Sequence, residues 1–95
     1  MLSWFTWNAS KAAVNQRKHA VSFEEARTVF EDSLARIHAD PVHSGQETRE
    51  IIVGHSTKGR LLLVSFTERG GVIRLISARR ATRHEREDYE EGSRP

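Results

Sequence analysis

The pattern of apolar and polar residues predicts two helices near the start of the chain. Asn8 or Ser10 can cap a first helix that ends near Lys18, because either side chain can accept a hydrogen bond from the first turn. Ser22 and Glu25 have the spacing of a capping box, which predicts the start of a second helix. Few residues separate the two segments, so we expect a tight helical hairpin.

The two helices differ in polarity. On the first, Lys11, Asn15 and Lys18 are spaced i, i+4 and i+7, so they share one polar face. The second is amphipathic, and its apolar residues recur at the helical period. Its predicted buried stripe is Phe23, Ala26, Val29 and Phe30.

Short alternating or apolar segments predict five strands. These lie at 5–7, 34–37, 50–55, 60–67 and 72–77. Short turns that contain glycine join the last three segments, which favours antiparallel hairpins. The fourth segment is apolar on both faces, so we expect it at the centre of the sheet. One of its faces then lies on the helices, and the other is covered by another element or forms a groove.

A third helix is predicted from Thr82, because Glu85 gives it a second capping box. Its only large apolar residue is Tyr89, so the helix is marginal unless Tyr89 docks or a partner holds it. The expected fold is one α+β domain over residues 1–91. Two N-terminal helices pack on an antiparallel sheet, a polar C-terminal helix follows, and 92–95 form a flexible tail.

Composition narrows the classes of chemistry. A chain of 95 residues has room for one core, and its apolar runs are too short to span a membrane. It contains no cysteine, which excludes disulfides, thiolate metal sites and cysteine nucleophiles. The start of the chain shows no secretory signal, so we expect a cytoplasmic protein. His38, Asp40 and His43 lie on a loop and are interpreted as turn residues, so no metal or cofactor is expected.

Basic residues are concentrated in the second half of the chain. The formal net charge is only +2, but eight basic residues face two acidic ones between Lys58 and Arg86. Such a block favours a polyanionic partner, with RNA or DNA first, whereas the alternative is a solvated face of ion pairs. The residues expected to bind RNA are Lys11, Lys18, Lys58, Arg74 and Arg83.

Hairpin geometry predicts one cluster of cationic side chains. The open ends of the last two strands meet at one edge of the sheet, which brings Arg60 near Arg79 and Arg80. His19, at the end of the first helix, completes the candidate site. Three guanidinium groups could stabilise the extra charge of a pentacoordinate phosphorus, and the imidazole could carry a proton.

Each member of this cluster also has a structural interpretation. His19 could favour the negative end of the helix dipole. Arg60 could pair across strands with Glu50, and the other two arginines could pair with the acidic residues at 87–91. Composition and spacing leave both interpretations open.

Five motifs occur in order along the chain and carry a family resemblance. They are FTWN at 5–8, KHAVSFEEA at 18–26, GHSTKGRLL at 54–62, TER at 67–69 and IRLISARRA at 73–81. Together they resemble the BrnT toxins of bacterial type II toxin–antitoxin modules, from about Leu2 to Glu91. The KHxVSF and ISARRA blocks are specific as a pair.

This resemblance implies a RelE/ParE-like fold and a metal-independent ribonuclease that arrests growth. It also implies attack of a ribose 2′-hydroxyl on the adjacent phosphorus. The implied partner is a BrnA-type antitoxin with a ribbon-helix-helix domain, and operator DNA is contacted only through that antitoxin. Arg79 and Arg80 match the two arginines of the family's ISARRA motif, and Arg60 matches the arginine of its Gly-Arg pair. His19 and Lys18 match the family's Lys-His pair.

Two positions depart from the family pattern. Asn8 stands where the family usually has aspartate, and it remains a good helix cap. Ala20 stands where the family usually has glycine, so a positive φ there would cost about 1 kcal/mol. Two other functions stay open at this stage. They are a nucleic-acid or partner-binding module without catalysis, and a gyrase-directed toxin of the ParE type.

Overall fold

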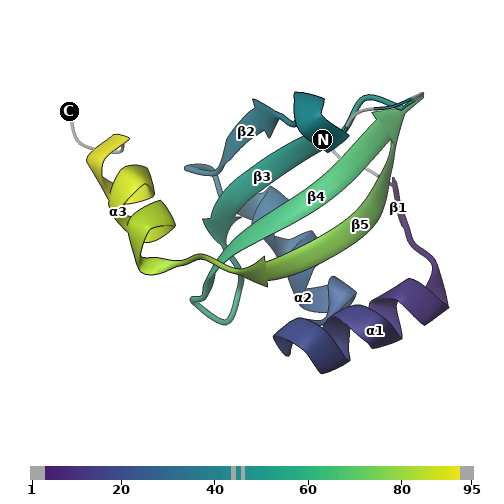
Figure 1. Cartoon of the computed structure of the whole chain (residues 1–95), viewed down its shortest axis with the longest axis horizontal. Helices are drawn as coiled ribbons and strands as arrows, with labels where there is room; N and C mark the ends of the chain where they lie inside the picture. The colour runs from purple at the N-terminus through teal and green to yellow at the C-terminus, as the bar shows by residue number, and fades with distance from the viewer. Residues whose placement is uncertain (1–3, 44, 46, 93–95) are drawn as a thin grey trace.

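The computed structural model describes residues 4–43, 45 and 47–92, and it forms a five-stranded sheet with three helices (Figure 1). The strands are β1 (Trp4–Thr6), β2 (Arg36–Ala39), β3 (Glu50–His55), β4 (Leu61–Arg69) and β5 (Val72–Arg80). The helices are α1 (Ala9–His19), α2 (Phe23–Thr28) and α3 (Arg83–Gly92), with 3₁₀ turns at Val29–Glu31 and Pro41–His43. Of the predicted tail, Gly92 ends α3, and 93–95 lie outside the described residues. The helices within these ranges are too short or too polar to cross a bilayer.

The sheet is mixed, with strand order β1-β5-β4-β3-β2. β2, β3, β4 and β5 form the expected antiparallel meander. β1 pairs in parallel with β5, with Trp4 opposite Val72 and Thr6 opposite Arg74. The prediction of a purely antiparallel sheet is therefore wrong at this edge. After β1 the chain crosses over through both N-terminal helices before it forms the other strands, and β1 joins the sheet as a parallel edge strand.

β4 lies at the centre of the sheet, as its apolar sequence predicts, and one of its faces packs on α2. The buried residues of β4 on this face are Leu62, Val64 and Phe66. From the helical side they meet Phe23, Ala26 and Val29, and Phe30 packs edge-on against Phe66 with ring centroids 5.1 Å apart. The predicted stripe of the second helix is thus confirmed as the helical half of the core.

The predicted helix ends are confirmed at α1. Asn8, the first of the two alternatives, is the N-cap, and its Oδ1 accepts a hydrogen bond of 3.0 Å from the backbone N–H of Lys11. Ala20 ends the helix with φ 55°, and its N–H donates to the carbonyl of Gln16 at 2.9 Å. The left-handed conformation that glycine favours is therefore adopted here by alanine.

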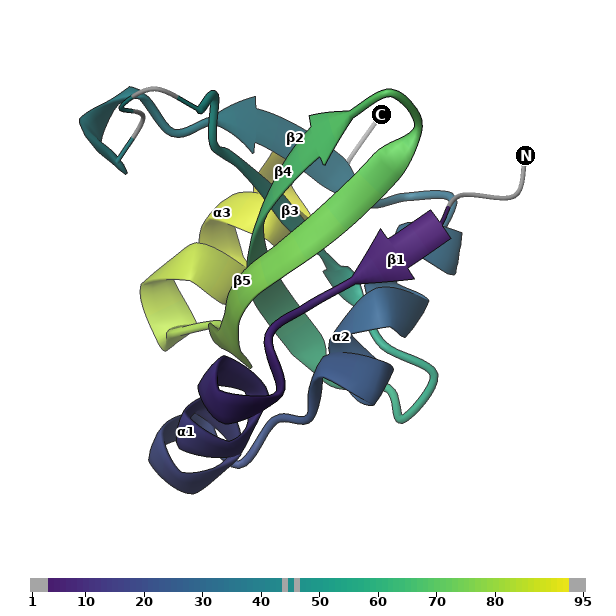
Figure 2. The same cartoon turned by 90° about the vertical axis from the view of Figure 1, so that its right-hand side faces the viewer.

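α3 lies on the side of the sheet opposite α2 (Figure 2). Tyr89 is buried, and its hydroxyl donates to the carbonyl of Leu34 at 3.1 Å. The guanidinium of Arg36 donates to the Tyr89 carbonyl at 2.8 Å and lies 5.1 Å from the centre of its ring. The polar helix is thus held by docking of Tyr89, as the sequence requires. It covers one end of the second face of the sheet and leaves the other end open.

Candidate nucleic-acid interface

The strand ends meet as predicted, but the arginine pair is divided between the two faces of the sheet. Leu62 pairs with Arg80, and Leu63 pairs with Arg79. Successive side chains of a strand point to opposite faces. Arg80 therefore shares the helix face with buried Leu62, and Arg79 lies on the face that α3 covers. The expectation that three guanidinium groups gather in one cluster is wrong for this reason.

Arg79 is held by Glu85 of α3. Its two terminal nitrogens donate to the two carboxylate oxygens, each at 2.8 Å. Glu85 also accepts from the backbone N–H of Thr82 at 2.8 Å, and Thr82 Oγ1 accepts in return from the Glu85 N–H at 3.2 Å, so the predicted capping box is confirmed. The Arg79 hydrogen bonds, supported by Thr82, lower the pKa of Glu85 to about 2. The acidic partner of this arginine therefore precedes the predicted 87–91 segment.

Arg60 is held by Glu25, a carboxylate buried at the start of α2. The Arg60 Nε donates to Oε2 of Glu25 at 2.9 Å, and Nη2 donates to Oε1. The same Nη2 donates at 3.1 Å to the carbonyl of Ala20, the residue after α1. These hydrogen bonds lower the pKa of Glu25 and raise that of Arg60. The hypothesis of a cross-strand pair with Glu50 is wrong, and Arg60 instead joins the hairpin of β3 and β4 to the α1–α2 turn.

Glu25 was predicted to close a capping box, and half of that box forms. Ser22 Oγ accepts from the Glu25 N–H at 3.0 Å, as in a capping box. The Glu25 carboxylate, however, accepts from Ser56 Oγ at 2.7 Å and from Arg60, and within the described residues it does not return to the Ser22 backbone. A long-range ion pair thus outcompetes the local hydrogen bond.

Asn15 fixes α1 against the edge of β5. Its side-chain nitrogen donates to the carbonyls of Ala78 at 2.8 Å and of Val21 at 3.0 Å, and its Oδ1 accepts from the Ala78 N–H at 3.0 Å. β1 pairs only with residues 72–74 of β5, so the Asn15 amide satisfies backbone groups that a longer strand would have paired. Asn15 is therefore buried, and the predicted shared face is confirmed, because Asn15 lines the same groove as Lys11 and Lys18.

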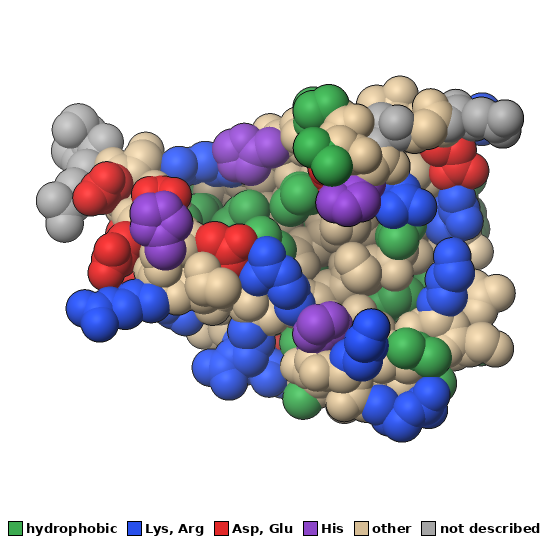
Figure 3. Space-filling view, viewed as in Figure 1, with side chains coloured by type: hydrophobic (Ala, Val, Ile, Leu, Met, Phe, Trp, Pro, Cys, Tyr) green, Lys and Arg blue, Asp and Glu red, His purple; other side chains and the backbone are tan. Residues whose placement is uncertain are grey.

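A groove of about 300 Å³ lies between α1 and β5. Its cationic or titratable side chains are Lys11, Lys18 and His19, and no carboxylate lines it among the described residues. The space-filling view shows basic side chains and a histidine gathered over α1 and near the end of β5 (Figure 3). The groove is lined by Ser10, Lys11, Val14, Asn15, Lys18, His19, Ile76 and Ser77.

Arg80 lies on β5 three residues beyond Ser77, which lines this groove. Arg60 contacts Ala20, so the C-terminal end of α1 lies beside the end of the sheet at which β4 begins and β5 ends. Arg80 is exposed, and within the described ranges its guanidinium has no ion-pair partner. The structure therefore brings His19, Lys18 and Lys11 together and leaves Arg80 available at the same end of the molecule.

The other residues expected to bind RNA are spread over separate surfaces. Arg74 pairs with Glu47 on the open face of the sheet, and Arg83 pairs with Glu87 at 3.1 Å on α3. Lys58 is exposed in the turn between β3 and β4. These three cations are not part of the groove.

The histidines of the 40s loop also lie apart from the groove. His43 Nδ1 lies 3.1 Å from Asp40 Oδ2, within the same 3₁₀ turn region. His38 lines a pocket between β2 and α3. Among the described residues, no three potential metal ligands come together.

Comparison with known proteins identifies the family. Residues 7–85 match the family model described as "Ribonuclease toxin, BrnT, of type II toxin-antitoxin system". The chain belongs to the BrnT family. The resemblance seen in the sequence motifs is thereby confirmed, and ribonuclease toxins of type II toxin–antitoxin systems are its functional class. The match gives no support to the gyrase alternative.

A solved BrnT structure has the same overall fold. The 1.1 Å crystal structure of the Brucella abortus ribonuclease toxin, BrnT, superposes with a TM-score of 0.66. The comparison covers 86% of this chain and 100% of that one, at 19% sequence identity. A search of curated proteins found no match.

Sequence reasoning missed three residues that arrange the site. They are Asn15, which holds α1 against β5, and the carboxylates Glu25 and Glu85, which hold Arg60 and Arg79 respectively. The first two lie within or beside family motifs, but their partners are far along the chain. Only Glu85 carries a usable local signal, since it is close in sequence to the arginine it holds.

Proposed function

We propose that this BrnT protein cleaves RNA without a metal ion, in the groove between α1 and β5. The observation that supports this site is a set of basic side chains that have no carboxylate partner among the described residues. Lys11, Lys18 and His19 line the groove, and Arg80 follows three residues after Ser77 on β5. By contrast, Arg60 and Arg79 are each neutralised by a carboxylate. A negatively charged backbone is attracted most strongly where cations are not already paired.

The proposed reaction is an internal transesterification. The ribose 2′-oxygen loses its proton and bonds to the adjacent phosphorus, and the bond from phosphorus to the 5′-oxygen breaks. That leaving oxygen takes up a proton. The products are a 2′,3′-cyclic phosphate and a 5′-hydroxyl, so atoms and charge balance with no added reagent.

The groove side chains have distinct roles in this proposal. His19 carries a proton to or from the reacting oxygens, which is the usual contribution of a positioned imidazole. Arg80 donates hydrogen bonds to the phosphate oxygens as charge develops on them, aided by Lys18. Lys11, two turns earlier on α1, binds the RNA backbone beside the reacting phosphate.

Arg60 and Arg79 act as positioning residues in this proposal. Arg60 holds the carbonyl of Ala20, so it fixes the turn directly after His19. Arg79 fixes the end of β5, where Arg80 lies, against α3. Their bidentate carboxylate partners leave them little freedom to bind a phosphate as well.

The partner proposed from the family is a BrnA-type antitoxin with a ribbon-helix-helix domain. The family description itself includes an antitoxin, and the complex would contact operator DNA only through that partner. The proposed place of action is the cytoplasm, where RNA is available, and the fold is proposed to be of the RelE/ParE-like type. Co-purification with a ribbon-helix-helix protein encoded beside this chain tests the partner.

Incubation of the purified protein with RNA in EDTA tests the proposed reaction. We expect fragments with 2′,3′-cyclic phosphate ends from the wild type. Arg80→Ala should leave the RNA intact while melting at the wild-type temperature, and it should relieve growth arrest in cells. Arg27→Ala, which removes a half-exposed arginine of α2 that pairs with Glu31, is the control.

A module that binds RNA without cutting it is the second candidate. It is favoured because, in the part of the chain that the structure describes, no carboxylate that could serve as general base lines the groove. A binder would shift RNA in a gel, lose that shift steeply with salt, and release no fragments. Fragments that carry a 5′-phosphate, and no phosphate at the 3′ end, would instead contradict the 2′-hydroxyl mechanism.

A further inference from the structure

Trp4 is the feature of this chain that its proposed catalysis leaves unused. Its side chain is 78% exposed, although tryptophan is among the side chains with most to gain from burial. Phe5, the next residue, packs on Phe30 in the core with ring centroids 5.1 Å apart. Strand alternation therefore directs Trp4 and Thr6 to the other face, beside Val72, which is also 40% exposed.

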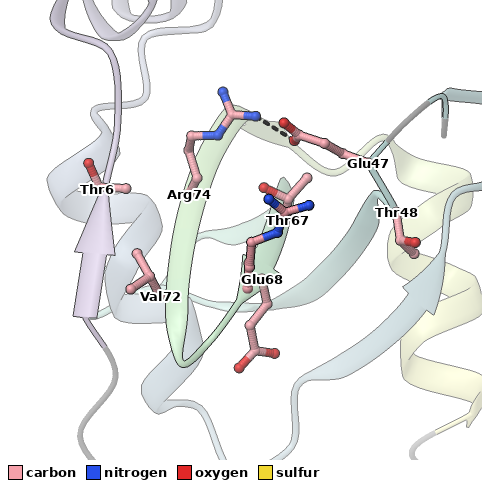
Figure 4. A pocket seen from close by; sticks show the side chains of 8 residues that line it. Thr6, Glu47, Thr48, Thr67, Glu68, Val72 and Arg74 are labelled. Carbon is pink, nitrogen blue, oxygen red and sulfur yellow. Dashed lines mark hydrogen bonds and ion pairs between the residues drawn. The ribbon is translucent and has the colours of Figure 1, made fainter.

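A pocket of about 450 Å³ lies on the open face of the sheet, and its lining includes Thr6 of the same strand and Val72, the residue that pairs with Trp4. Arg74 reaches from β5 toward Glu47 and pairs with it across the pocket (Figure 4). Two carboxylates and two guanidinium groups line the space, so their formal charges cancel. The lining residues are Thr6, Glu47, Thr48, Thr67, Glu68, Arg69, Val72 and Arg74.

The chemistry of this pocket suits a nucleobase. Threonine hydroxyls, a guanidinium and a carboxylate offer both donors and acceptors, which is what the polar edge of a base requires. An exposed aromatic ring offers a stacking surface, and single-stranded RNA is bound mainly through such stacking. A phosphate would gain less here than a base, because Arg74 is already paired with Glu47 and the carboxylates of the lining balance its two guanidinium groups.

The pocket and the proposed catalytic groove both lie along β5. Val72 lines the pocket, and Ser77, five residues further along β5, lines the groove. Five residues of strand span about 16 Å. A few nucleotides of extended RNA cover that length, so one strand can occupy both places.

We propose that Trp4 and this pocket form a base-binding subsite for the substrate RNA. A base a few nucleotides away from the scissile phosphate stacks on Trp4, and its polar edge meets Arg74, Glu47 and the threonines. This inference rests on the proposed function for the identity of its ligand. It makes Trp4 a determinant of affinity, and the pocket a determinant of which base is preferred at that position.

Intrinsic fluorescence with an uncleavable RNA tests the subsite. A single-stranded 2′-O-methyl RNA decamer binds without being cut, because its 2′-oxygens are blocked. Trp7, the other tryptophan, packs edge-on against Phe23 with ring centroids 6.0 Å apart, so a change in emission on RNA binding reports chiefly on Trp4. We expect quenching in the wild type and none in Trp4→Phe.

Affinity provides the second readout. Trp4→Ala should raise the Kd for the decamer about tenfold, as expected for loss of one base–aromatic stack. It should leave the Kd for a 2′-O-methyl dinucleotide unchanged, since that ligand is too short to reach from the groove. Val42→Ala, at an apolar side chain that is 85% exposed near the opposite edge of the sheet, should change neither value.

The outcomes separate this inference from the proposed function. Suppose that the wild type cleaves RNA, that Trp4→Ala leaves the Kd unchanged, and that RNA does not quench Trp4. That result would overturn the subsite and would not affect the proposed ribonuclease activity. Wild-type protein that shows Trp4-dependent binding but no cleavage supports the subsite and overturns catalysis. Quenching by an antitoxin but not by RNA would assign Trp4 to a protein interface and so overturn the subsite.

Discussion

Arg79 and Glu85 join the end of β5 to the first turn of α3 through two hydrogen bonds of 2.8 Å each. Glu85 also closes the N-terminal capping box of that helix through Thr82. One carboxylate therefore holds a strand end and a helix start together. Since Arg80 follows Arg79 directly, this contact also fixes the backbone that carries the proposed phosphate-binding arginine.

Glu85→Gln should destabilise the protein in a manner that depends on pH. The pKa of Glu85 is lowered from 4.5 to about 2, so its stabilising effect is complete above pH 4.5 and is lost as the pH falls toward 2. Because both partners are partly exposed, we expect a loss of about 1 kcal/mol at neutral pH. Melting curves at pH 7 and pH 3 measure it, and the difference from wild type should shrink at pH 3. A constant difference would contradict the account, and Glu87→Gln, which removes a more exposed pair, is the control.

Asn15→Ala should destabilise the fold through three lost hydrogen bonds. The Ala78 N–H and the carbonyls of Ala78 and Val21 would lose their side-chain partner at a buried position. Unpaired buried polar groups cost about 1–3 kcal/mol, so we expect a loss of about 2 kcal/mol in the free energy of unfolding. Denaturant titration measures this loss. A change below 0.5 kcal/mol would show that α1 is held by other contacts.

Ala20→Gly should stabilise the protein. Ala20 has φ 55°, a left-handed conformation that glycine adopts without the steric cost that a Cβ brings. The gain should be about 1 kcal/mol in the free energy of unfolding, seen as a higher Tm. Ala13→Gly, an exposed position inside α1, should lower stability by a similar amount because glycine is a poor helix former. If both variants shift the Tm in the same direction, the conformational explanation fails.

Arg60→Ala should lower the stability of the fold, and any loss of catalysis should follow from that lower stability. Glu25 would remain buried without the guanidinium that lowers its pKa, and we expect a loss of about 2–3 kcal/mol at neutral pH. The loss should shrink as the pH falls below 4.5, since a protonated Glu25 needs no cation. Denaturant titrations at pH 7 and pH 4 test both statements. If the variant is as stable as wild type, the pair with Glu25 does not hold Arg60, and Arg60 is again a candidate for binding phosphate.

Local signals allowed much of this fold to be predicted from the sequence. Asn8 and Ser22 cap their helices as expected because a cap depends only on residues within one turn. Tyr89 docks because it is the one apolar group that α3 can bury. The hairpins of β3, β4 and β5 follow from short turns between apolar segments.

Long-range partners could not be predicted in the same way. The alternation at 5–7 indicates a strand but does not say which edge it joins or in which direction. Glu25 has a local role in the sequence pattern and a different partner, Arg60, in space. The pattern of the sequence predicts that the last strand ends at 77, whereas β5 continues to Arg80. That extension imposes strand alternation on the arginine pair, and it is why Arg79 leaves the candidate site.

We propose that RNA is cleaved in the groove between α1 and β5. The most direct test is the single-turnover rate of RNA cleavage in EDTA for His19→Gln, Arg80→Ala and the control Arg27→Ala. Loss of a proton carrier or of a phosphate-binding group should lower the rate by about 100-fold or more with an unchanged Tm, and the control should stay within about twofold of wild type. Folded His19→Gln and Arg80→Ala variants that cleave RNA at the wild-type rate would contradict the claim.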